Sequence, residues 1–144
     1  MRYIELAKTV AFSYKANCVE LMRIRRDDRI RIPAIISGHV RGRISKPVEA
    51  EVIAREQRLL ADQRFTYLLQ ATQAVEFALA MVQRKPQGEL TVRLFEMVYR
   101  DATHRLYGAA IELNISERTA KRYNSYLLKM VALRMGYLPI IDLL

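Results

Sequence analysis

Charged and hydrogen-bonding side chains recur at helical spacing near the C-terminal end of the chain. Arg118 and Arg122 lie four residues apart, and Lys121 and Ser125 follow at steps of three and four. On a helix, this spacing places such side chains on one face. Arginine and lysine bind phosphates and guanine edges, and serine hydrogen-bonds to either. The segment therefore predicts contact with a nucleic acid.

The residues before this face are typical of a helix-turn-helix. Ala109 and Ala110 are small, as required where two short helices cross. Asn114 falls in the turn, and asparagine tolerates a left-handed backbone. Ser116 is placed to cap the second helix through its hydroxyl. We therefore expect a helix over residues 106–113, a turn, and a second helix that begins at Ser116.

The second helix is expected to have one buried face and one outward face. Ala120, Tyr123 and Leu127 share the buried face, which Met130 or Val131 continues. The residues expected to point outward, into the major groove of a DNA duplex, are Glu117, Arg118, Lys121, Arg122 and Ser125. The glutamate either accepts a hydrogen bond from cytosine or only favours the helix N-terminus. An ordinary helical hairpin with a solvated basic face is the alternative.

Most of the remaining positive charge lies in one segment. The 144 residues include 24 Lys and Arg against 15 Asp and Glu, a net charge of +9. Residues 23–46 hold eight basic and two acidic side chains, and they also contain helix-breaking proline and glycine. We therefore expect a basic loop over 27–46, with a solvated linker as the alternative. The residues of this loop expected to contact DNA phosphates are Arg41, Arg43 and Lys46.

The rest of the chain predicts long helices and an all-α fold. Apolar residues recur at steps of three and four over residues 4–26, and again from Pro47 to about Lys85. Residues 61–82 follow a seven-residue period, which forms a seam that packs on the first helix or on a second copy of the chain. Periodicity leaves open whether this stretch is one helix or two. A short helix is expected over 90–101.

We expect two domains. An N-terminal helical region occupies residues 1–86, and a C-terminal helix-turn-helix DNA-binding domain occupies residues 87–144. A homodimer through the seam would predict paired DNA half-sites about 10 base pairs apart.

The composition argues against several other kinds of function. The single cysteine, Cys18, lies on an apolar stripe and is expected to be a buried core thiol. The two histidines, His39 and His104, are far apart in sequence, so we expect no metal site and no cofactor. No apolar run reaches the roughly 18 residues of a membrane span. We expect an intracellular protein without catalytic residues and not an enzyme.

Three motifs together resemble a known family. The first is ISKPVEAEVIARE at residues 44–56, which follows the glycine-containing basic segment 38–43. The second is a short helix that ends in Tyr99, and the third is ELNISERTAKRY at residues 112–123, followed by a helix that ends at Gly136. In order and spacing, these motifs resemble the RinA/ArpU group of phage and prophage transcriptional regulators, over about residues 25–137.

This resemblance implies a fold and a function. The C-terminal part of that family is similar to region four of bacterial sigma factors, and the family activates late phage genes. Carried over to this chain, the resemblance implies binding to double-stranded DNA through the outward residues named above, and action with host RNA polymerase. It also implies a cytoplasmic, nucleoid-associated location in a bacterial host cell. The chain departs from the family at Arg105 and Leu106, where Thr-Trp is frequent, and at Tyr123, where Trp is frequent.

Two other functions fit parts of the sequence. A phage small terminase subunit, which takes part in DNA packaging, also joins a helix-turn-helix to long helices, but its helix-turn-helix usually comes first in the chain. A non-catalytic helical interaction module would carry its basic charge incidentally and would have no specific DNA site.

Overall fold

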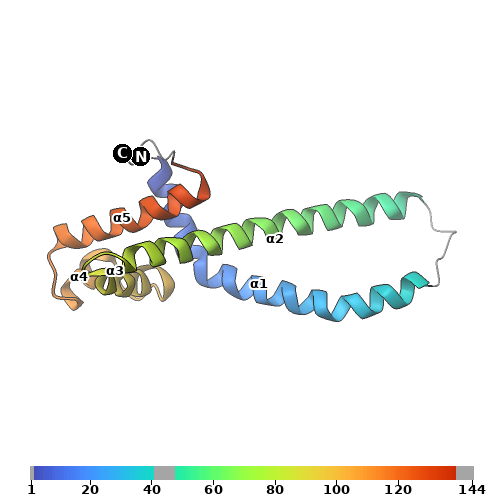
Figure 1. Cartoon of the computed structure of the whole chain (residues 1–144), viewed down its shortest axis with the longest axis horizontal. Coiled ribbons are helices and arrows are strands. Elements are labelled where there is room, and N and C mark those ends of the chain that lie inside the picture. Colours follow the sequence, from blue (N-terminus) through green and yellow to red (C-terminus); the bar gives the residue numbers. More distant parts are fainter. Residues whose placement is uncertain (1, 41–47, 139–144) are drawn as a thin grey trace. The chain divides into compact units, whose positions relative to one another are not determined.

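The computed structural model describes residues 2–40 and 48–138, and within them the side chains of residues 2–26 and 51–138. Throughout this described part the elements are helical and none is a strand, so the all-α prediction is confirmed there (Figure 1). The elements are α1 (Arg2–Val40), α2 (Val48–Gln83), α3 (Gly88–Phe95), the π-helical turn η1 (Glu96–Arg100), α4 (Leu106–Glu112) and α5 (Glu117–Met135).

The chain divides into two compact units. One comprises the described residues of Met1–Asn17 and Gln70–Leu144, and we call it the core unit. The other comprises the described residues of Cys18–Leu69, and we call it the two-helix unit. This division does not coincide with the boundary expected near residue 86, because the start of α1 and the end of α2 belong with α3, α4 and α5.

Helix α1 is longer than the sequence predicted. A helix was expected over 4–26 and a loop over 27–46, but the backbone is helical through Val40. The loop prediction is therefore wrong for residues 27–40. It was based on helix breakers. A proline inside a helix removes one backbone hydrogen bond and crowds the preceding turn, but extending an existing helix avoids the cost of starting a new one. The predicted phosphate contacts at Arg41, Arg43 and Lys46 lie outside the described residues.

Helix α2 is continuous from Val48 to Gln83, which decides for one helix rather than two. The turn into α3 requires a glycine. A Cβ atom at Gly88 would clash with the carbonyl oxygen of Val82, so any larger residue would force the backbone of this turn to move. The preceding residue, Gln87, adopts a left-handed backbone with φ of 68°.

The core unit is built around small residues and two large aromatic ones. Ala7 and Ala11 of α1 and Ala74 of α2 are fully buried in one apolar cluster, and small side chains let helices approach closely. Phe95 and Tyr99 belong to the same cluster. Other members of the cluster are Val10, Ala71, Val75, Ala78, Val82, Leu94, Val98, Ala109, Ala110, Leu113, Ala120, Leu127, Leu128 and Val131.

The heptad seam on α2 packs mainly against other residues of the same chain. Val75 and Val82 belong to the apolar cluster of the core unit, and Thr72 is also buried. Packing within the chain is thus confirmed for these positions. In the two-helix unit, Leu68 is buried but Ala61 is exposed.

The two-helix unit has little buried apolar surface in its described part. Leu21 and Leu68 are buried, whereas Cys18, expected to be a core thiol, is half-buried. Glu20 accepts from Arg23 and from Arg64, each at 2.8 Å. The hydrogen bond from Arg23 and the two positive charges lower the pKa of the glutamate.

Nowhere in residues 2–40 and 48–138 is a helix both long enough and apolar enough to cross a membrane.

Candidate nucleic-acid interface

Helices α4 and α5 are joined by a tight turn in the core unit. Asn114 adopts the left-handed backbone expected of it, with φ of 59°. The amide of Ile115 donates to the carbonyl of Ala110 at 3.0 Å, which ties the turn to the end of α4. Ala109 and Ala110 are buried, and Ile115 packs partly buried against the same apolar cluster. The local predictions for this turn are confirmed.

Helix α5 begins with a side-chain cap. The Ser116 hydroxyl accepts a hydrogen bond from the amide of Thr119 at 3.1 Å, as predicted. Such a cap satisfies one of the amides that a helix leaves unpaired at its N-terminus. By contrast, α4 begins at Leu106, and its N-cap residue Arg105 makes no side-chain capping hydrogen bond. The start of α5 is therefore the better fixed of the two.

The outward face of α5 is exposed as predicted. Arg118, Lys121, Arg122 and Ser125 are all exposed. Glu117 lies at the positive end of the helix, and its carboxylate is 3.5 Å from the ammonium group of Lys121. The arrangement offers cationic side chains and a hydroxyl on one side of a capped helix, with a carboxylate that orients one of the cations.

Two further lysines extend this basic face, and the sequence reasoning missed both. Lys129 is exposed and lies seven residues after Arg122, so helical spacing was a sufficient signal for it. Lys85 follows the end of α2, and its ammonium group lies 3.7 Å from the ring centroid of Tyr126 on α5. No sequence pattern links Lys85 to α5, because their proximity depends on how the helices pack.

The buried face of α5 differs from the prediction at one position. Tyr123 was expected to be buried, but it is half-buried, and the neighbouring Asn124 is buried instead. The Tyr99 hydroxyl donates to the Asn124 side-chain oxygen at 2.5 Å. This hydrogen bond is what allows an amide to occupy an apolar core. Burial raises the pKa of Tyr99 to about 12.

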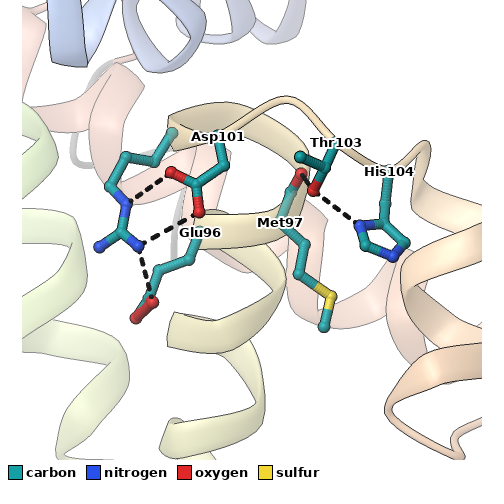
Figure 2. A network of polar contacts seen from close by, with 6 residues as sticks. Glu96, Met97, Asp101, Thr103 and His104 are labelled. Carbon is teal, nitrogen blue, oxygen red and sulfur yellow. Dashed lines mark hydrogen bonds and ion pairs between the residues drawn. The ribbon is translucent and has the colours of Figure 1, made fainter.

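A polar network holds the connection between η1 and α4. Glu96 and Asp101 both contact the guanidinium of Arg100, at 3.2 and 3.1 Å. Figure 2 draws these contacts as dashed lines. The hydrogen bond from Arg100 lowers the pKa of Asp101. The same view shows Thr103 between the carbonyl of Met97 and the ring of His104. This network fixes the path of the chain into α4.

His104 also reaches α4 itself. Its Nε2 lies 2.6 Å from a carboxylate oxygen of Glu112, the last residue of that helix. The short helix expected over 90–101 is observed as α3 followed directly by η1. The segment between η1 and α4 is held by the hydrogen bonds of Thr103 and His104. The contacts position α4, and through α4 the start of α5.

No family model matches the chain. Neither a curated protein nor a solved structure matches it at a significant level. In the part of the chain that the structure describes, there is also no group of three or more histidine, cysteine or acidic residues placed to hold a metal ion.

Proposed function

We propose that this protein binds double-stranded DNA in a sequence-specific manner through α5. In this proposal the N-terminal half of α5 enters the major groove, where Arg118, Lys121 and Arg122 contact base edges or phosphates. The turn at Asn114 and the cap at Ser116 orient that half of the helix.

The observation that carries the proposal is the exposed cationic face at the capped start of α5. Lys121 and Arg122 expose their side chains there, and Lys85 and Lys129 add positive charge beside them. The buried side of α5 is fixed by Ala120 and Leu127, which are fully buried. A rigidly held helix with a cationic outer face is what major-groove binding requires.

The biological role follows from the resemblance to the RinA/ArpU group. On that basis we propose a transcriptional activator of phage or prophage late genes, which acts with RNA polymerase in a bacterial cytoplasm. The helix-turn-helix would correspond to region four of a sigma factor. In this chain the motif follows the long helices α1 and α2, and this order favours the regulator over a small terminase subunit.

The test is selection of duplex DNA from a random pool by the purified full chain, followed by affinity measurements across salt concentration. We expect one enriched motif, and a log–log salt slope that reports the number of phosphates contacted. Weak binding to all sequences with no enriched motif would contradict sequence-specific regulation. A large ring by light scattering would favour the packaging function instead.

Single substitutions assign the roles within the face. Arg122→Ala should weaken binding by about 1–3 kcal/mol and relax preference at one base position if this arginine reads a base. Lys129→Ala should weaken binding to all sequences evenly and reduce the salt slope by about one if it contacts a phosphate. Arg93→Ala is a matched control, because Arg93 is an exposed arginine of the same unit that lies on α3. It should leave both quantities unchanged.

A further inference from the structure

A cavity lies against α5 within the core unit. It encloses about 370 Å³, within the range of roughly 300–1,000 Å³ found for small-molecule sites. Its wall is formed by the end of α2, the connection from α2 to α3, α3 itself and the middle of α5. The residues from α5 include Arg122 and Ser125, which also belong to the outward face described above.

The body of the cavity wall is apolar and aromatic. Its lining includes the apolar residues Val82 and Pro86 and the aromatic residues Tyr123 and Tyr126. Aromatic side chains prefer flat apolar partners, which they contact by stacking or edge-to-face. An ion that is polar on all sides would leave these walls without matching contacts. The apolar lining therefore favours a ligand with a flat hydrocarbon body.

The charge of the wall has one sign. Lys85, Arg122 and Lys129 line the cavity, and none of the lining residues is an aspartate or a glutamate. Thr91 and Ser125 add hydroxyl groups. Two of the three cations already lie against tyrosine rings: Lys85 on Tyr126 and Arg122 over Tyr123 at 5.6 Å. They are thereby held at the wall, where an anionic group can reach them.

We propose that this cavity binds a small organic anion with a flat apolar body, of the aromatic carboxylate class. The ring lies between the tyrosines and the apolar residues, and the carboxylate pairs with the lysines and the arginine. Because Arg122 and Ser125 also belong to the proposed DNA face, the anion and DNA compete for the same side chains. This second step rests on the proposed function, whereas binding of the anion does not.

The experiment titrates 2-naphthoate into the full chain and follows backbone amides by two-dimensional NMR. We expect saturable shifts that are largest at Thr91, Ser125 and Tyr126. Replacing both Lys85 and Lys129 by alanine should raise the Kd at least about tenfold, because the carboxylate loses two partners. The matched control is Arg134→Ala, which removes an exposed cation of α5 that lies outside both the cavity and the proposed DNA face. It should change the Kd less than about twofold.

A second probe separates charge from shape. The uncharged 2-naphthamide should bind at least about tenfold more weakly than 2-naphthoate. Equal affinity of the two compounds, unchanged affinity in the double lysine variant, or shifts confined to other surfaces would each overturn the assignment of the cavity.

The competition is tested separately. Saturating 2-naphthoate should weaken binding of a DNA duplex by at least about fivefold at constant salt, in the wild type but not in the double lysine variant. Naphthoate binding with no effect on DNA affinity would overturn the competition alone. A chain that binds naphthoate but no DNA would overturn the proposed function and leave the cavity assignment standing.

Discussion

The two units of this chain differ in how they use apolar side chains. The core unit combines parts of α1 and α2 with α3, η1, α4 and α5. Its buried apolar side chains meet in one cluster, and four large ones are exposed: Leu6, Phe12, Tyr107 and Ile111. The two-helix unit draws only on α1 and α2. Among its described side chains, two large apolar residues are buried, and seven are exposed: Val19, Met22, Val52, Ile53, Leu59, Leu60 and Tyr67.

This contrast shows that helical periodicity and burial are separate properties. Ile53, Leu60 and Tyr67 lie seven residues apart, so they follow one line along α2 as core residues do. They are nevertheless exposed, with Leu60 at 65%. A helix forms from its own hydrogen bonds, but burial of more than one stripe requires helices on more than one side.

The largest expected effect comes from a matched pair of substitutions that compares the two units directly. Leu127→Ala in the core unit should reduce the free energy of unfolding by about 2–5 kcal/mol, because the leucine is fully buried and leaves a cavity. Leu60→Ala in the two-helix unit should change it by less than about 0.5 kcal/mol. Urea denaturation measures both. Equal losses would contradict the described difference in burial.

A second substitution tests the polar contact inside the core unit. Asn124→Ala should cost about 1–3 kcal/mol, because the buried Tyr99 hydroxyl loses its acceptor. Adding Tyr99→Phe to that variant removes the unpaired hydroxyl and should recover part of the loss. A double-mutant cycle with no coupling energy would show that the two groups act independently.

The same tyrosine makes the stability of the core unit sensitive to alkaline pH. The pKa of Tyr99 is raised by burial to about 12, from 10.0 in its ordinary state. The folded protein therefore holds the Tyr99 proton more tightly than the unfolded chain does. The contribution of this proton to the free energy of unfolding is complete below pH 10 and is lost as the pH rises towards 12. The loss should reach about 2 kcal/mol. It is measured as the difference in pH dependence between wild type and Tyr99→Phe, and identical profiles would contradict it.

The smallest expected effect concerns how α4 and α5 begin. Ser116→Ala should cost about 0.5–2 kcal/mol, because it removes the acceptor for the Thr119 amide. Arg105→Ala at the corresponding position of α4 removes no cap and should leave stability nearly unchanged. Thermal unfolding of the two variants measures the difference. A comparable shift in Tm for both variants would show that the hydrogen bond of the Ser116 cap does not stabilise the protein.

The features that the sequence predicted correctly are those decided by neighbouring residues. The turn at Asn114, the cap at Ser116 and the left-handed Gly136 that ends α5 follow from the backbone preferences of single residue types. The exposed face of α5 follows from a fixed rotation per residue. Local chemistry was sufficient for all of these.

The features that the sequence did not predict depend on contacts between distant segments. Asn124 is buried because Tyr99 lies opposite it, and spacing on α5 alone favoured Tyr123. Lys85 joins the basic face because α2 ends beside Tyr126. The helical backbone at residues 27–40 was missed for another reason: breakers were given more weight than the cooperativity of a helix that is already formed.

The core unit joins residues from near both ends of the described chain. Ala7, Val10 and Ala11 complete the same cluster as Leu127 and Val131. During synthesis, Ala7, Val10 and Ala11 are added to the chain more than a hundred residues before Leu127 and Val131. At about 5–20 residues per second, they wait roughly ten seconds for their partners. The basic face of α5 is therefore assembled only after α5 itself has been synthesised, and a nascent chain that stops before α5 would lack it.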